Sequence, residues 1–75
     1  MNGAQKVTKC LAEHTAWLPE SKINRILKMN NAGGRISDAR AKGVNIKDKW
    51  MEKTPAYNRH KRYTVTMKEY KKHYG

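Results

Sequence analysis

Apolar residues in the first part of the chain recur at the spacing of an α-helix. Three apolar residues and a histidine stand at positions i, i+3, i+4 and i+7 of one face: Val7, Cys10, Leu11 and His14. Because residues at this spacing share one side of a helix, the pattern predicts an amphipathic helix near the N-terminus. Asn2 is suited to cap this helix, since its side chain can accept a hydrogen bond from a backbone N–H of the first turn.

Two further helices are predicted on either side of a turn. Pro19 marks the start of the second helix, because proline is tolerated at a first helical position. The apolar face of this helix consists of Ile23, Ile26 and Leu27. The asparagines and glycines of residues 29–34 are typical of a turn. A third helix is predicted over about residues 34–42, ended by Gly43. Its inward-facing residues are Ile36 and Ala39.

From residue 44 onward, apolar and polar residues alternate along the chain, which is typical of β-strands. In the first run, residues 44–51, the inner positions are Val44, Ile46 and Trp50, with Asp48 as an exception. The second run contains Tyr63, Val65 and Met67. Because the basic residues 52–62 separate the two runs, we predict a hairpin with a long basic loop. Trp50 and Trp17 are expected to pack in the core, because they are the largest apolar side chains.

The predicted order of elements is helix, helix, turn, helix, strand, basic loop, strand. A two-stranded hairpin is not stable alone in water and must pack on the helices. We therefore predict an α+β fold of the winged helix-turn-helix class, with three helices and a two-stranded β-hairpin wing. The domain is assigned to residues 1–67. Residues 68–75 are assigned to a basic C-terminal tail, which is either a short helix or disordered.

The charge balance indicates an anionic partner. The 75 residues include 17 Lys and Arg and 6 Asp and Glu, which gives a formal net charge of +11. Such an excess favours nucleic acid, an anionic membrane or an acidic protein surface. A membrane is disfavoured because no stretch approaches the roughly 20 apolar residues of a span and no helix combines a basic face with a broad apolar one. The single cysteine, Cys10, fits a reducing compartment, and we expect a soluble cytoplasmic protein.

Two motifs carry a resemblance to a known family. The first is Gly-Arg-Ile-Ser-Asp-Ala-Arg-Ala-Lys-Gly-Val-Asn-Ile at residues 34–46, and the second is Arg-Tyr-Thr-Val at residues 62–65. With Trp50 and the basic loop between them, they resemble small winged helix-turn-helix domains encoded by bacteriophages and prophages. The resemblance implies that fold, DNA binding and a location in the bacterial host cytoplasm or nucleoid. Ala39 stands where the family usually has Leu, which implies a smaller core beneath the third helix.

The third predicted helix holds the candidates for base contacts. In a helix-turn-helix, the outward face of this helix enters the major groove. The candidates are Arg35, Ser37 and Lys42, because Arg is the commonest reader of guanine and Ser can pair with several bases. Asp38 is expected to pair with Arg35 or Lys42, and Arg40 is expected to have a structural role.

Further DNA contacts are predicted from the loop and from the second helix. The candidates for phosphate or minor-groove contacts in the loop are Lys53, Arg59, Lys61 and Arg62. The candidates for backbone contacts on the second helix are Lys22, Arg25 and Lys28. Gly33 and Gly34 are expected to form the turn, with the alternative that their N–H groups meet a phosphate. Lys71 and Lys72 of the tail are interpreted as a solvated face.

The remaining chemistry does not indicate an enzyme. Cys10 and His14 share one helical face, but two ligands do not make a structural zinc site, and both are expected to pack in the core. No carboxylate pair, phosphate-binding glycine loop or oxyanion donor accompanies them, so we predict no catalysis, no metal and no cofactor. Tyr57 is an exposed aromatic that could stack on a sugar or dock a protein. Tyr70 and Tyr74 either cover the core edge or mediate self-association.

The leading hypothesis is a transcriptional regulator or architectural factor that binds double-stranded DNA. Residues 33–42 would lie in the major groove and residues 53–62 on the backbone or minor groove. A homodimer or cooperative binding is expected, because so small a footprint limits affinity. The alternative hypothesis is a winged-helix protein that binds an acidic host protein, such as transcription machinery or a nuclease. Asp38 and the small residues of the third helix favour this alternative slightly.

Overall fold

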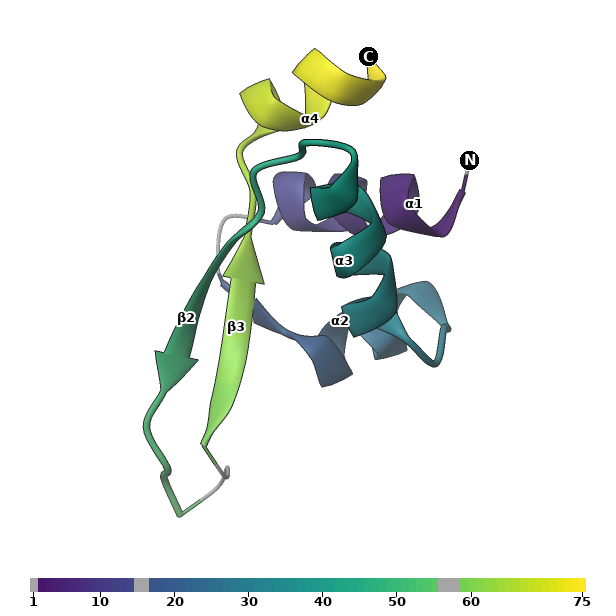
Figure 1. The fold of residues 1–75 in the computed structure, drawn as a ribbon. Coiled ribbons are helices and arrows are strands. Elements are labelled where there is room, and N and C mark those ends of the chain that lie inside the picture. The colour runs from purple at the N-terminus through teal and green to yellow at the C-terminus, as the bar shows by residue number, and fades with distance from the viewer. Residues whose placement is uncertain (1, 15–16, 56–58) are drawn as a thin grey trace.

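The computed structural model describes residues 2–14, 17–55 and 59–75, and its elements are drawn in Figure 1. In chain order these are α1 (Gly3–Glu13), β1 (Leu18–Pro19), α2 (Glu20–Leu27), α3 (Ala32–Ala41), β2 (Lys47–Met51), β3 (His60–Thr64) and α4 (Met67–Tyr74). Within the described ranges the fold is therefore α+β, with four helices and a three-stranded antiparallel sheet. The prediction of three helices and two strands lacked β1, and it gave a short helix in the place of α4 only as one of two alternatives.

Side-chain caps set where the first and third helices begin. The Asn2 side chain accepts from the Gln5 N–H at 2.8 Å, which confirms the predicted cap of α1. Asn31 caps α3 in the same way, accepting from the Gly34 N–H at 3.0 Å. α3 therefore begins at Ala32, and the two glycines lie in its first turn rather than in the preceding connection. The predicted terminator Gly43 follows α3 with a φ of +93°, a conformation that favours glycine.

The sheet has the strand order β1-β3-β2. Tyr63 in the central strand pairs with Leu18 on one side and with Asp48 on the other. β1 has only two residues, too few to produce a recognisable alternation, and sequence analysis did not predict it. The predicted strand limits were also wrong. Val44 and Ile46 are buried before β2 begins, and Met67 starts α4 instead of ending a strand.

The core consists of aliphatic and small residues and contains neither tryptophan. Its members come from helices, strands and connections: Ala4, Val7, Cys10, Leu11, Leu18, Ile23, Ala32, Ile36, Ala39, Val44, Ile46 and Val65. Trp50 is 55% exposed and Trp17 is half-buried, so their assignment to the core was wrong. Trp50 belongs to the β2–β3 hairpin, which extends beyond the helices (Figure 1).

The segment that sequence analysis sets apart as a tail forms most of α4 and packs against α1. Thr66 caps this helix by accepting from the Glu69 N–H at 3.1 Å. The Gln5 side chain donates to the Tyr70 hydroxyl at 3.4 Å, and Tyr74 packs partly buried against the core. Of the two alternatives for residues 68–75, the structure shows the helix. Figure 1 places it at the end of the molecule away from the hairpin tip.

Glu69 connects α4 to the segment between α3 and β2. Its carboxylate accepts from the Asn45 backbone N–H at 2.9 Å and lies 2.8 Å from His73 Nε2. The Asn45 hydrogen bond is the main cause that holds the pKa of Glu69 below its ordinary value, and His73 adds to it. Because the folded pKa is depressed, this contact stabilises the fold above the ordinary carboxyl pKa of 4.5. That stability is lost as the pH falls through the folded pKa.

Glu69→Gln should therefore lower the melting temperature at about pH 7 and have a smaller effect at about pH 3. Glutamine keeps the size of the side chain but cannot offer a carboxylate to Asn45. Thermal unfolding of both proteins followed by circular dichroism measures the difference. Glu52→Gln, an exposed carboxylate in the segment after β2, is the matched control. A Glu69→Gln effect that is equal at both pH values would contradict the assigned contact.

Candidate nucleic-acid interface

The exposed face of α3 combines small and polar residues with cations at its edge. Ser37, Asp38 and Ala41 are exposed, opposite the buried Ile36 and Ala39. Arg35 lies at the edge nearest α1, and its Nε is 3.4 Å from Asp38 Oδ2, as the spacing predicts. Lys42 is exposed at the helix end and, together with Arg35 and Asp38, lines a shallow depression between α3 and the start of α1.

Gly3 of α1 makes room for the Arg35 side chain. A Cβ at position 3 would overlap the Cδ of Arg35, so only glycine fits here without moving that side chain. The guanidinium group is thus held at the edge of α3, beside Asp38. Both side chains of this ion pair remain about half exposed, at 44% for Arg35 and 54% for Asp38. An exposed pair of this kind contributes little stability, so a competing acceptor can replace Asp38 at low cost.

The backbone N–H groups at the start of α3 already have partners within the chain. The Gly33 N–H donates to Glu20 Oε1 at 3.0 Å, and the Gly34 N–H donates to Asn31 Oδ1 at 3.0 Å. Asn24 Oδ1 accepts from the Ala32 N–H at 2.8 Å. These side-chain oxygens satisfy the N–H donors at the start of α3 within the chain. The prediction that Gly33 and Gly34 could donate to a phosphate is therefore corrected.

Arg40 joins α3 to the base of the hairpin. Its Nε and Nη2 both donate to the Ile46 carbonyl, at 3.2 and 2.7 Å. Nη2 also lies 2.9 Å from Asp48 Oδ2, and the guanidinium carbon is 5.8 Å from the centre of the Tyr63 ring. The structural role predicted for Arg40 is confirmed. Asp48, the exception in the alternating pattern, faces α3 because it pairs with this arginine.

Tyr63 stays a neutral phenol at this junction. Burial raises its pKa, and the charges of Glu20 and Asp48 raise it further against the opposing effect of Arg40. The guanidinium of Arg40 therefore lies over an uncharged ring, which is the arrangement of a cation–π contact. The junction between α3 and the sheet is thus held by hydrogen bonds, an ion pair and an aromatic contact.

The register divides the predicted hairpin cations between two sides. We call one side the α3 side, because two of its residues contact Arg40; it carries Asp48, Trp50, Lys61 and Tyr63. The opposite side carries Lys47, Lys49, Arg62 and Thr64. There Lys49 Nζ lies 4.6 Å from the centre of the Trp17 ring, and Arg62 Nε donates to His60 Nε2 at 3.1 Å. The candidate Arg62 therefore does not share a face with Lys61.

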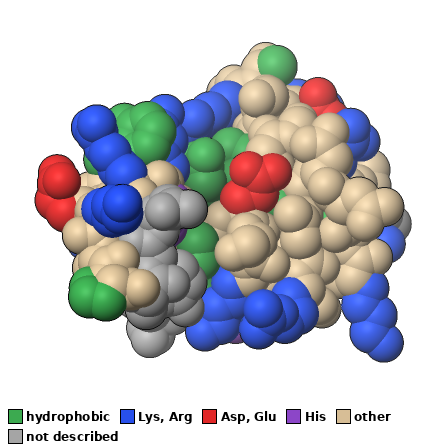
Figure 2. Space-filling model, turned by 90° about the horizontal axis from the view of Figure 1, so that it is seen from below, with side chains coloured by type: hydrophobic (Ala, Val, Ile, Leu, Met, Phe, Trp, Pro, Cys, Tyr) green, Lys and Arg blue, Asp and Glu red, His purple; other side chains and the backbone are tan. Residues whose placement is uncertain are grey.

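Trp50, Arg59 and Lys61 form an exposed group that we call the tryptophan cluster. The Arg59 guanidinium carbon is 4.9 Å from the centre of the Trp50 ring, and Lys61 Nζ is 5.1 Å from it. In the view from below, blue Lys and Arg side chains border green hydrophobic surface (Figure 2). Sequence analysis selected both cations but placed Trp50 in the core. The sequence did hold one indication that Trp50 is exposed, because the cations Arg59 and Lys61 occupy the facing part of the hairpin.

The other candidate cations lie in exposed positions. Lys53 is exposed in the segment after β2, and Lys22, Arg25 and Lys28 are exposed on α2 and at its end. Lys28 has a φ of 53° and closes α2 with a left-handed residue, donating its N–H to the Asn24 carbonyl. Tyr57 lies outside the described residues, so the hypothesis that it stacks on a ligand concerns a position the structure does not describe.

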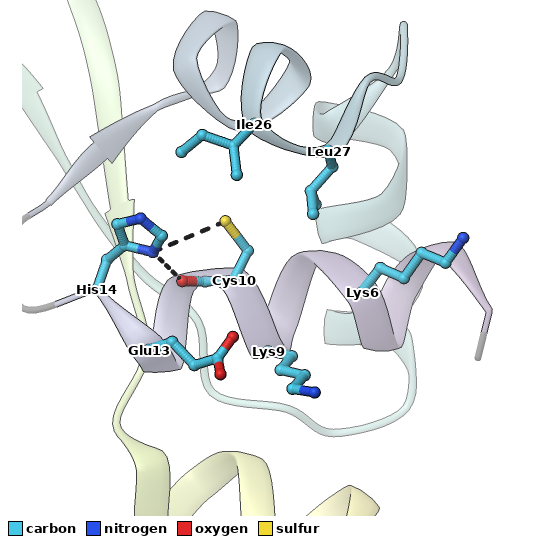
Figure 3. A pocket seen from close by; sticks show the side chains of 7 residues that line it. All are labelled: Lys6, Lys9, Cys10, Glu13, His14, Ile26 and Leu27. Atoms are coloured by element: carbon cyan, nitrogen blue, oxygen red, sulfur yellow. Dashed lines mark hydrogen bonds between the residues drawn. The ribbon is translucent and has the colours of Figure 1, made fainter.

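Cys10 and His14 lie at a shallow hollow between α1 and α2 (Figure 3). His14 Nδ1 is 2.6 Å from the Cys10 carbonyl oxygen and 3.9 Å from the Cys10 sulfur. Cys10 is buried, and burial, with a contribution from Glu13, raises the pKa of its thiol. The thiol is therefore not activated as a nucleophile. Across residues 2–14, 17–55 and 59–75, no three metal-ligating side chains come together.

Comparisons with known proteins do not extend this description. No protein-family model, curated protein or solved structure matches the chain. In the part of the chain that the structure describes, no helix has the length and apolar character needed to cross a membrane.

Proposed function

We propose that this chain is a winged helix-turn-helix protein of the phage type that binds double-stranded DNA. α3 lies in the major groove, and the β2–β3 hairpin is the wing that contacts the DNA backbone or minor groove. The order α1, β1, α2, α3, β2, β3 and the three-stranded sheet support this assignment. The observation that carries it is the Arg40–Asp48 junction, because it fixes the hairpin side that carries Trp50 and Lys61 beside α3.

The charge distribution supports a polyanionic ligand. The formal net charge is +11, and exposed cations lie on α2, at the edge of α3 and along the hairpin. A duplex presents phosphates along both sides of its groove, so cations on separate elements can contact it together. The small exposed residue Ala41 allows α3 to approach the base edges closely.

Within this proposal, Arg35 is the base-reading residue. Its ion pair with Asp38 is exposed and therefore weak, so the guanidinium can exchange the carboxylate for a guanine. Ser37 and Lys42 complete the contact surface of α3. One small domain gives limited affinity for DNA. We therefore also propose that the protein binds as a dimer or cooperatively along the DNA.

The direct test is titration of a random blunt duplex, followed by fluorescence anisotropy at several salt concentrations. About six phosphate contacts should give a slope of log K against log salt near −5, from about −0.9 per contact. Absence of binding at low salt, or binding that does not respond to salt, would overturn the proposal.

One observation favours a second candidate function. Asp38 is 54% exposed near the centre of the outward face of α3, where a phosphate would be repelled. A protein partner could pack against Asp38 and the small residues of α3. Acidic groups of the same partner would then contact the cations of the hairpin. The duplex titration separates the two candidate functions. If this chain binds a protein partner and not DNA, its binding to random duplex should be negligible.

A further inference from the structure

Building on the proposed function, we infer that Trp50 stacks on an unpaired DNA base. The consequence is a preference for duplex ends or junctions that carry a single strand over fully paired duplex. The inference rests on the tryptophan cluster, which the winged-helix assignment does not need for its major-groove contacts.

The exposure of Trp50 is the first observation. It is 55% exposed, whereas Trp17 is half-buried and covered by Lys49 at 4.6 Å. Trp50 lies on β2, an edge strand, so no further strand of the described sheet lies beside it on the side away from β3. Arg59 and Lys61 lie over this ring, so a base would stack on the ring surface that they leave exposed or would displace one of them from it.

The positions of the two cations are the second observation. Arg59 and Lys61 both come from the β3 side of the hairpin, 4.9 and 5.1 Å from the ring centre. They bring positive charge next to the stacking face, where the phosphates flanking a stacked base would lie. Asp48 is 3.9 Å from Lys61 but is also held by Arg40, so it neutralises the cluster only in part. An aromatic ring beside backbone-binding cations is the general arrangement of single-strand binding surfaces.

The requirement for an unpaired base follows from the structure of a duplex. Paired bases are already stacked on their neighbours, and an indole can contact their faces only if a step is unstacked at a cost in free energy. A base in an overhang offers its face without that cost. The wing would therefore reach past the paired segment held by α3 and stack on the first unpaired nucleotide.

The test compares two labelled DNAs that share the same paired segment, one blunt and one with a short thymidine overhang, on both strand polarities. Anisotropy should show about tenfold tighter binding to the overhang DNA for the unmodified protein, the effect of one stacked base. Trp50→Leu should remove this preference, so that the overhang DNA and the blunt duplex bind with equal affinity. Trp50→Phe should retain part of the preference.

Trp17→Phe is the matched control and makes Trp50 the single tryptophan. This variant should keep the preference, and its emission should be quenched by the overhang DNA and not by the blunt duplex. Circular dichroism verifies that each variant is folded. Equal affinity of the unmodified protein for the two DNAs, or a preference that survives Trp50→Leu, overturns the inference. Quenching by an acidic peptide alone, without any by DNA, also overturns it.

These outcomes are distinct from failure of the proposed function. If the protein does not bind blunt duplex at low salt, the proposed function itself is wrong. If it binds blunt duplex with the expected salt dependence but shows no preference for the overhang, only the role of Trp50 is wrong.

Discussion

Ile23→Ala should lower the free energy of unfolding by about 2–5 kcal/mol, the usual range for truncating a fully buried aliphatic side chain. Ile23 is 0% exposed and lies in the core between the helices and the sheet. A domain of this length has a total stability of about 4–11 kcal/mol, from about 0.05–0.15 kcal/mol per residue. The substitution should therefore remove a large part of the stability and leave some of the protein unfolded at room temperature.

Ile26→Ala is the matched control, because it makes the same chemical change in the same helix. Ile26 is 41% exposed, so its truncation should cost less than about 1 kcal/mol. Urea unfolding followed by circular dichroism measures both variants against the unmodified protein. Equal destabilisation by the two substitutions would show that α2 does not pack through Ile23 as described.

The double variant Arg59→Gln with Lys61→Gln should bind duplex DNA about 50-fold more weakly at about 0.1 M salt. Each phosphate contact contributes about 0.9 to the slope of log K against log salt, so losing two contacts should make the slope about 2 units shallower. Both residues lie on the hairpin and contact the exposed Trp50 ring, so glutamine at these positions removes charge without opening the core. Anisotropy titrations at several salt concentrations measure both quantities.

Lys71→Gln with Lys72→Gln is the control for nonspecific loss of charge. These exposed lysines lie on α4, at the end of the molecule away from the hairpin tip (Figure 1). Their neutralisation changes the net charge by the same amount as the hairpin variant and should leave the slope almost unchanged. If both double variants alter the slope equally, net charge alone governs binding and the hairpin has no particular role.

The helices could be predicted from the sequence because their signals are local. The i, i+3, i+4 spacing, the Asn2 cap and the Gly43 terminator each depend on residues within one or two turns. The pairing of Asp38 with Arg35 is local in the same sense, since three residues separate them on one helix. The alternation of β2 and β3 predicted a hairpin, although their limits were wrong by several residues.

The features that sequence analysis missed depend on distant parts of the chain. β1 exists because Leu18 pairs with Tyr63, and alternation cannot be read from two residues. The N–H of Gly33 is occupied because the carboxylate of Glu20, which lies in another helix, accepts from it. Trp50 is exposed although the alternation of apolar and polar residues places it on the inner side of the strand. The alternation shows which side a residue faces, but it does not show how far along the hairpin the helices cover that side.

The central claim is that α3 and the cationic hairpin form a single surface for duplex DNA. Mapping of amide chemical shifts during titration with a blunt duplex tests it most directly. We predict that resonances of α3, around Arg35 and Ser37, and of the hairpin, around Arg59 and Lys61, shift together at the same DNA concentration, while those of α4 stay in place. Shifts confined to α4 or to the Cys10 hollow, or shifts in only one of α3 and the hairpin, would contradict the account.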